Sequence, residues 1–425
     1  MSRLRNVGML AVGTAAGHVV SILAAPLLTR VYSPADFGLL AVFTAVTAIA
    51  GVAVSLRLGL AVAVPADNEE GIEIVLVGVM LVAVMAALAA ILVALFGDQL
   101  SALLGEPRLR PLLAFLPLYL GSAGIFNMLN FWFARENRFG PVAALNTVRG
   151  VLVATAQYVL GVLRSGAAGL VAGHVAGPVV QAVGLLAVSS RIKDRMLVGT
   201  LDWRRVKVVL GKYRMFILYG TPQALVNAFN QSMPALVLTA TFGASVAGFY
   251  LMAHRLVAAP VSLVGSSVRQ VIYPQLARDF DRGVALRSAT RTTLAMAALA
   301  VPAAAVIFVF GPALFAWLLG TEWRETGEFA RWLIIWLAVG FVNIPSVSLI
   351  PLLDMQRWHL IYEVVYLGAR LTALLIGTQQ NDVRLGIILF AMVGAFFNVV
   401  LSFAPLLRLR SIERDRREPA LTSQV

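Results

Sequence analysis

The chain has 425 residues, of which 60% are hydrophobic and 13% are charged, and its mean hydropathy is +0.85. This balance excludes a soluble globular domain and indicates a protein that lies in the lipid bilayer. The net charge of +13 comes from basic residues in polar segments that would face anionic lipid, so no nucleic-acid partner is expected. The lack of cysteine excludes disulfides, thiolate metal sites and cysteine nucleophiles.

Apolar stretches near the roughly 20 residues that a bilayer crossing requires recur along the whole chain. The first is too long for a signal-peptide core and is expected to be retained. The pattern predicts twelve transmembrane helices, at residues 7–31, 37–64, 72–97, 110–134, 140–163, 166–190, 215–242, 246–273, 288–311, 328–351, 358–378 and 384–407.

The longest polar stretch between spans follows the sixth helix and divides the chain. It predicts an N-terminal six-helix bundle at residues 1–190, a cytoplasmic basic linker at 191–213, a C-terminal six-helix bundle at 214–408 and a cytoplasmic tail at 409–425. Two such six-helix repeats would resemble the parallel repeats of several transporter classes.

Within the linker, Asp202 is expected to cap a short amphipathic helix. Such a helix would lie in the cytoplasmic membrane interface, and an irregular basic loop is the alternative. Its apolar face would consist of Trp203, Val206, Leu210 and Tyr213.

The distribution of basic residues predicts the orientation. With the N-terminus inside, 22 of the 34 Lys and Arg residues lie in cytoplasmic segments and seven lie outside. The positive-inside rule therefore places both termini in the cytoplasm.

Five arginines lie inside predicted spans that hold a single carboxylate, Glu363. An arginine near mid-bilayer costs about 2.5 to 3.5 kcal/mol on insertion scales, so such residues normally face a bundle interior or a watery cavity. A planar, permanently charged guanidinium suits phosphate or diphosphate. The sequence therefore predicts a cationic cavity and transport of a phosphorylated substrate. The five are Arg57, Arg149, Arg255, Arg269 and Arg370.

Arg57, Arg255 and Arg370 are the first candidates for contacts with a diphosphate, and Arg149 is similar, because all lie well inside their spans. Arg269 is close enough to a span end to snorkel. Neutral side chains that would suit sugars or line a cavity, with packing between helices as the alternative role, are Asn127, Asn130, Gln157, Asn227, Asn230 and Gln231.

Glu363 is the candidate for coupling transport to an ion gradient, and a structural pair with Arg370, seven residues later on the same helix face, is the alternative. The chain has no GxxxxGK[ST], GxSxG, HExxH or EF-hand pattern. No enzyme activity, cofactor or metal site is therefore expected.

The stretch that joins the first two predicted spans, at residues 26–40, reads PLLTRVYSPADFGLL. It resembles the same junction in Wzx-type bacterial oligosaccharide flippases, members of the superfamily that also contains MATE multidrug exporters and lipid II flippases. Further matches are SLR at 55–57 and VIYPQLA at 271–277. Gly59 departs from the family, which often has an acidic or polar residue there, and this puts coupling details in doubt.

The resemblance implies an all-α integral membrane protein with two six-helix bundles in a V-shaped, MATE-like arrangement. It also implies passage of a polyprenyl-diphosphate-linked oligosaccharide from the cytoplasmic to the periplasmic leaflet of the bacterial inner membrane, by alternating access through a central cavity. O-antigen and related polysaccharide pathways use such carriers, so the polymerase and glycosyltransferases of the pathway would be partners besides membrane lipids.

Two other functions remain open from the sequence. A MATE-type small-molecule exporter of cations would need carboxylates in its cavity, where this chain has arginines. A membrane-embedded polysaccharide polymerase or ligase would present a large periplasmic loop, but the predicted outside loops are short, with the longest near 98–109 and 312–327.

Overall fold

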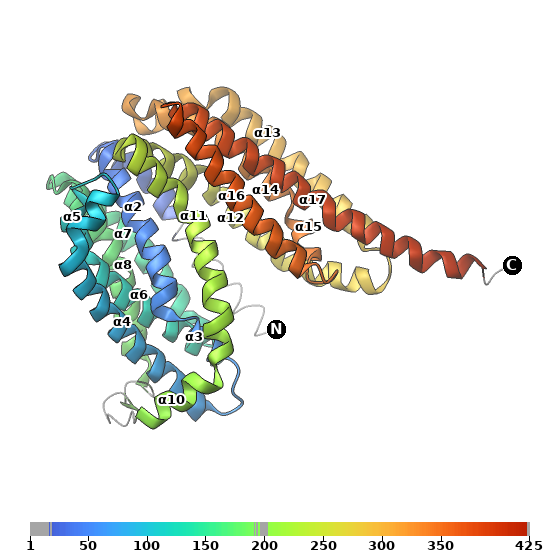
Figure 1. Ribbon diagram of the computed structural model, residues 1–425, viewed down its shortest axis with the longest axis horizontal. Helices are drawn as coiled ribbons and strands as arrows, with labels where there is room; N and C mark the ends of the chain where they lie inside the picture. The colour runs from blue at the N-terminus through green and yellow to red at the C-terminus, as the bar shows by residue number, and fades with distance from the viewer. Residues whose placement is uncertain (1–16, 18, 191, 193, 196–202, 423–425) are drawn as a thin grey trace. The chain divides into compact units, whose positions relative to one another are not determined.

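The computed structural model describes residues 17, 19–190, 192, 194–195 and 203–422 (Figure 1). This part of the chain contains helices and turns and no strand, so the expected all-α fold is confirmed. Within it, nine helices are long and apolar enough to cross a membrane. They are α2 (Pro34–Ser55), α4 (Asn68–Leu103), the continuous segment Leu109–Arg135, α7 (Phe139–Val162), α8 (Gly166–Val188), α12 (Ala244–Asp281), α13 (Ala285–Leu319), α16 (Gln356–Gln379) and the stretch Val383–Arg414 of α17 (Val383–Thr422).

The other three predicted spans coincide with helices that are shorter or more polar. The first is described as a helix from Val19 to Leu28, and its expected start at residues 7–16 lies outside the described residues. The seventh is α11 (Thr221–Phe242), and the tenth is divided into α14 (Arg324–Val342) and α15 (Ile344–Leu349). The count of twelve spans stays a prediction.

The segment Leu109–Arg135 is itself composite. It consists of α5 (Leu109–Leu112), one turn of 3-10 helix, η1 (Leu113–Phe115), and α6 (Leu116–Arg135). A second 3-10 turn, η3 (Thr321–Trp323), connects α13 to α14.

The chain forms two compact units, Met1–Gly248 and Phe249–Val425. In the first, α11 packs along α2, so the seventh predicted span groups with the N-terminal six. A Cβ added at Gly38 would overlap the carbonyl of Ala244, and one added at Gly248 would overlap the carbonyl of Pro34. Glycine therefore allows the starts of α2 and α12 to touch inside the first unit. The domain boundaries at 190 and 214 stay a prediction.

The start of α2 is fixed by local sequence. Ser33 is the N-cap, its hydroxyl accepts from the Asp36 amide at 3.3 Å, and the Asp36 carboxylate accepts from the Ser33 amide at 3.0 Å. Pro34 follows at the first helical position, where its missing N–H costs nothing. The expected helix start in the stretch 26–40 is thus confirmed, with its first residue at Pro34 instead of 37.

The polar stretch after α8 contains the short helix α10 (Trp203–Lys212), which lies across the start of α4 (Figure 1). Val206 and Tyr213 are buried on the first unit, but Trp203 is 63% exposed, with the Lys207 ammonium 5.8 Å from its ring. Of the apolar face expected for this helix, Val206 and Tyr213 are therefore buried, while Trp203 faces away from the unit. Asp202, its expected cap, lies outside the described residues.

Three acidic residues in the first turns of α4 bind α10 and the residues that precede it. Lys212 donates to Glu70 at 2.5 Å, and this hydrogen bond raises the pKa of the lysine, which stays charged. The other two ion pairs are Arg205 with Glu73 at 3.3 Å and Arg195 with Glu69.

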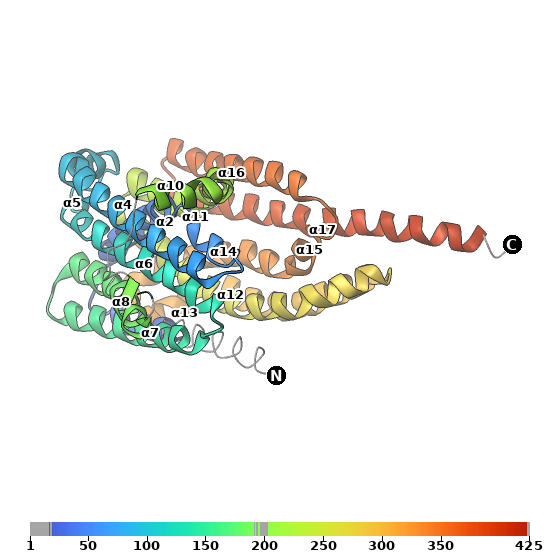
Figure 2. The ribbon, with the colours of Figure 1, turned by 90° about the horizontal axis from the view of Figure 1, so that it is seen from below.

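The second unit consists of the remainder of α12 and of α13 to α17 (Figures 1 and 2). Helices α13 and α14 approach closely because Gly311 and Gly327 face each other, and an added Cβ at Gly311 would lie 3.0 Å from the Gly327 carbonyl oxygen. One residue after Gly311, Pro312 has no N–H to donate to the carbonyl of Phe308, four residues earlier.

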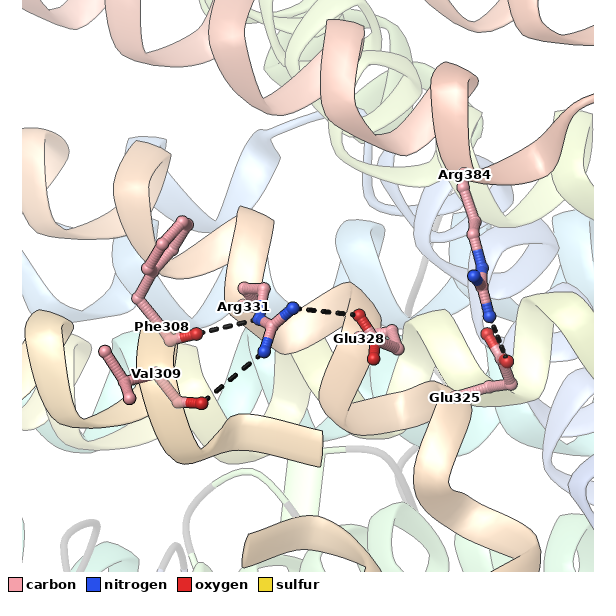
Figure 3. A network of polar contacts seen from close by, with 6 residues as sticks. All are labelled: Phe308, Val309, Glu325, Glu328, Arg331 and Arg384. Carbon is pink, nitrogen blue, oxygen red and sulfur yellow. Dashed lines mark hydrogen bonds and ion pairs between the residues drawn. The ribbon is translucent and has the colours of Figure 1, made fainter. Parts of the chain in front are cut away.

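A side chain from α14 supplies the missing donor (Figure 3). The Nε of Arg331 donates to the Phe308 oxygen at 2.8 Å, and its other nitrogens lie 3.4 Å from the Val309 oxygen and from Glu328. At the same end of the unit, Arg384 pairs with Glu325 at 2.6 Å. These contacts place four charged residues at the paired ends of α13, α14 and α17.

Candidate functional site

A sharp break separates α2 from the short helix α3 (Leu58–Ala61), and Arg57 lies at this break. Leu56 and Arg57 have φ values of 43° and 57°, so two successive residues with side chains adopt the left-handed conformation. Each such residue costs roughly 1 to 2 kcal/mol. Strain of this kind is typical of functional sites, where the surrounding structure maintains it.

Arg57 lines a cavity of about 320 Å³ inside the first unit, between α2, α3 and α6. Asn127 lines the same cavity, so the structure brings two of the predicted site residues together. The other polar or aromatic side chains of the lining are Thr47, Ser55, Tyr119 and Phe131. In the described part of the chain, no carboxylate belongs to this lining.

The guanidinium of Arg57 is half-buried, and its Nε is buried with no hydrogen-bond partner among the described residues. None of the ion pairs between described residues involves it either. A buried donor without an acceptor costs free energy, although the remainder of the half-exposed guanidinium reaches solvent. An anion in the cavity would supply an acceptor for this Nε.

The start of α11 adjoins Arg57. A turn of π-helix, η2 (Phe216–Gly220), precedes α11 and packs on α3, and a Cβ added at Gly220 would lie 3.7 Å from the Cβ of Arg57. The next residue, Thr221, has a buried hydroxyl with no hydrogen-bond partner in the described chain. Single π-helical turns are frequent at functional sites.

Gly59 has a steric role at the cavity. A Cβ at this position would overlap the ring of Phe131 and lie 3.0 Å from the Asn127 side-chain oxygen. Any other residue would therefore push α3 from α6 or fill the cavity. This contact gives a physical reason for glycine at position 59 of this chain.

Arg135, at the end of α6, was not selected from the sequence, but it holds the loop that follows α3. It donates to the backbone oxygens of Val62 at 2.9 Å, Pro65 at 2.7 Å and Asp67 at 3.0 Å. The loop connects α3 to α4, so Arg135 fixes the segment next to Arg57. In the sequence, Arg135 falls in the short polar stretch between two predicted spans, and nothing there indicated this role.

Arg149 and Gln157, on α7, are not among the residues that line the Arg57 cavity. The aliphatic part of Arg149 packs on α8, where a Cβ at Gly177 would lie 3.0 Å from its Cγ. Gln157 is 2% exposed and donates to the Leu170 oxygen of α8 at 2.9 Å, while its own backbone oxygen accepts from Tyr32 at 2.7 Å. Gln157 thus forms contacts between helices, the alternative role for the polar candidates.

The remaining polar candidates are divided between exposed and buried positions. On α11, Asn227 and Gln231 are exposed and hydrogen-bonded to each other at 3.0 Å, while Asn230 is buried. Asn130 on α6 is half-buried. None of these four lines the Arg57 cavity.

In the second unit, Arg370 is 4% exposed and is surrounded by aromatic rings. Its Cζ lies 3.9 Å from the ring centre of Phe390, 4.2 Å from that of Trp336 and 5.0 Å from that of Tyr366. Cation–π contacts of this kind can contribute about 2 kcal/mol when desolvated. The ring faces therefore stabilise the charge of Arg370 within its own unit.

Arg255 and Arg269 both lie on α12. Arg255 is half-buried and follows His254, whose ring stacks between Tyr250 and Trp336 with both centroids 5.9 Å away. Arg269 is exposed, in agreement with the snorkelling expected for it.

Glu363 pairs with a residue that the sequence did not select. Its carboxylate lies 3.4 Å from the Nε2 of His359, one turn earlier on α16, and both side chains are about one-third exposed. The structure thus gives Glu363 a second possible partner besides the expected Arg370, whose guanidinium turns toward the rings. The seven-residue spacing put both groups on one helix face, but it did not reveal the competing partners.

Comparison with known proteins agrees with this architecture. A family model described as "Polysaccharide biosynthesis protein" matches residues 27–328. The succinoglycan biosynthesis transport protein ExoT of Rhizobium meliloti (strain 1021) is 28% identical over 320 residues, which is 72% of this chain and 62% of the relative. The chain thus spans less than two thirds of that relative's length.

Two solved structures share the fold at low sequence identity. An inward-facing MATE-family multidrug resistance transporter superposes with a TM-score of 0.66 at 15% identity, covering 96% of each chain. The lipid II flippase MurJ, in an inward closed conformation, superposes with a TM-score of 0.69 at 12% identity, covering 95% of this chain and 90% of its own. The expected MATE-like fold is therefore confirmed.

Proposed function

The chain belongs to the polysaccharide biosynthesis protein family, and we propose that it is a flippase for polyprenyl-diphosphate-linked oligosaccharide. The substrate would move from the cytoplasmic to the periplasmic leaflet by alternating access, without chemical change. The observation that carries this proposal is the half-buried guanidinium of Arg57, whose buried Nε has no hydrogen-bond partner among the described residues, at a cavity whose described lining holds no carboxylate.

A diphosphate must leave water to cross the bilayer, and removing such a charge from water costs several kcal/mol. Fixed positive groups along the route can offset that cost. Arg57 would bind the phosphate oxygens in a fork, as guanidinium groups do. The amide of Asn127, in the same lining, would hydrogen-bond to the diphosphate or to the first sugar.

The basic residues of the second unit would act at other steps. Arg255 is half-buried on α12 and is our next candidate for a phosphate contact. Arg370, enclosed by three rings, would act through the positive potential it adds, because its charge has already left water. Arg149 would contribute in the same way in the first unit.

The names of two similar proteins support the class of substrate. One is a transport protein of succinoglycan biosynthesis and another is a lipid II flippase. We place the chain in a bacterial inner membrane, with both termini cytoplasmic, from its charge distribution. The polymerase and glycosyltransferases of the same pathway are the proposed partners.

A small-molecule exporter is the second candidate, because MATE multidrug transporters share the fold. Exporters of organic cations need negative charge in the binding cavity. The Arg57 cavity has the opposite charge, which favours an anionic substrate.

The test is accumulation of lipid-linked oligosaccharide on the cytoplasmic leaflet of cells that depend on this protein. Arg57→Ala should abolish flipping at normal expression, and Arg57→Lys should restore only part of it because an ammonium cannot form a fork. Arg282→Ala, at an exposed arginine outside the cavity, is the control. Full transport by the double variant Arg57→Ala, Arg255→Ala would refute the proposal.

We further propose that Glu363, paired with His359, couples transport to an ion gradient. Both side chains are about one-third exposed, so an ion can reach the pair. Glu363→Gln should then remove the dependence of transport on the gradient while the thermal stability in detergent changes little. Loss of stability with gradient dependence intact would show a structural role instead.

A further inference from the structure

A second cavity, of about 680 Å³, opens at the start of α13 in the second unit. It is separate from the residues discussed above and has two arginines in its lining, Arg287 and Arg291, one helical turn apart. Thr290 stands between them in the sequence and also lines the cavity. The apolar lining residues are Val284, Leu286 and Leu294.

Both arginines are exposed and have no ion pair or hydrogen bond within the described part of the chain. Their charges are therefore available to a ligand. Arg278, in the last turn of α12, and Arg282, in the turn between α12 and α13, are also exposed and add to the positive potential. No other ligand class than an anion suits this concentration of guanidinium groups.

Among the described residues of the lining, one is acidic, and it is already engaged. Glu413 of α17 is 6% exposed, and its Oε1 accepts from the backbone N–H of Leu286 at 2.9 Å, which caps the first turn of α13. This contact partly compensates the carboxylate charge, since helix N-termini carry a partial positive charge. It also holds α17 against the start of α13, which shapes one wall of the cavity.

The apolar part of the lining identifies the kind of anion. Leu294 is 65% exposed and Val284 is 44% exposed, so both present apolar surface beside the arginines. The cavity lies within the first three turns of α13, a 35-residue helix that is longer than a bilayer crossing requires, so these turns would reach the level of the lipid headgroups. A soluble anion would not use this apolar surface.

We propose that this cavity binds the headgroup of an anionic phospholipid. The phosphate would lie between Arg287 and Arg291, the Thr290 hydroxyl would donate to it, and the first part of an acyl chain would cover Leu294. The bound lipid would fill the space between α13 and α17 and so stabilise the packing of the second unit. Transport of the oligosaccharide does not require this site.

The experiment uses the purified full chain in a neutral detergent, titrated with phosphatidylglycerol while thermal unfolding is followed. We expect phosphatidylglycerol to raise the unfolding midpoint, and phosphatidylcholine and inorganic phosphate to have little effect. Arg287→Gln with Arg291→Gln should weaken the apparent affinity roughly thirtyfold, because each basic residue near an anionic headgroup contributes about 1 kcal/mol and 1.4 kcal/mol is a factor of ten.

Two further variants make the test sharp. Arg278→Gln with Arg282→Gln removes the same charge from the same end of the unit, outside the lining, and should weaken binding much less. Glu413→Gln keeps an acceptor for Leu286 but removes the negative charge, so it should strengthen binding. Equal losses in the two arginine pairs, or equal stabilisation by inorganic phosphate and phosphatidylglycerol, would overturn the proposal.

Discussion

Pro312 leaves the Phe308 carbonyl without a helical donor, and Arg331 donates to it instead. The contribution of this hydrogen bond to stability can be predicted. Of the hydrogen bonds of Arg331, only the one to the Phe308 oxygen is short, at 2.8 Å, while those to Val309 and Glu328 are 3.4 Å long. Bonds at the longer distance are weak, and a partly exposed i,i+3 ion pair contributes roughly 0.5 kcal/mol. The Phe308 carbonyl therefore dominates the energy.

Arg331→Met should lower the free energy of unfolding by about 2 kcal/mol, within the 1 to 3 kcal/mol cost of an acceptor left unpaired. The same change in a Pro312→Ala background should cost at least about 1 kcal/mol less, because the new amide of residue 312 can donate to Phe308 in the helical manner. The coupling energy between positions 312 and 331 is the difference between the cost of Arg331→Met with proline and its cost with alanine at position 312.

The four proteins of this double-mutant cycle would be unfolded by denaturant in mixed micelles. Arg324→Met is the matched control, since Arg324 is an exposed arginine on the same helix and should cost less than about 0.5 kcal/mol. If Arg331→Met costs the same with proline and with alanine at position 312, within about 0.5 kcal/mol, the proline explanation is wrong.

Three other predictions concern the first unit and the topology. Gly59→Ala should reduce transport with little loss of folded protein, because the added methyl group enters the Arg57 cavity; full activity would exclude the steric role of this glycine. Arg135→Met should lower stability by roughly 2 to 4 kcal/mol through its lost backbone contacts, against less than about 1 kcal/mol for the exposed Arg138→Met. In intact cells, an impermeant thiol reagent should label a cysteine placed at Gly105 but not one placed at Asp281, and the reverse pattern would overturn the orientation.

The sequence alone determined the class of the protein and much of the local structure. Hydropathy repeats reported the membrane spans because lipid requires every backbone group to be bonded within a helix. Ser33, Pro34 and Asp36 define the start of α2 through contacts within four residues, so the start was readable from the chain. Arg57 was also selected from the sequence, because a charged residue inside an apolar span is costly in lipid and therefore usually has a function.

Tertiary structure alone decided how each of these residues is used. Arg370 and Glu363 share a helix face, but rings from α14, α16 and α17 enclose the arginine and His359 takes the carboxylate. Arg57 and Asn127 line one cavity because α2 breaks and Gly59 allows α6 to approach. Residues far apart in the chain compete as partners for each of these side chains. Distances of a few ångströms decide which partner is bound, and the helical periodicity of the sequence does not contain those distances.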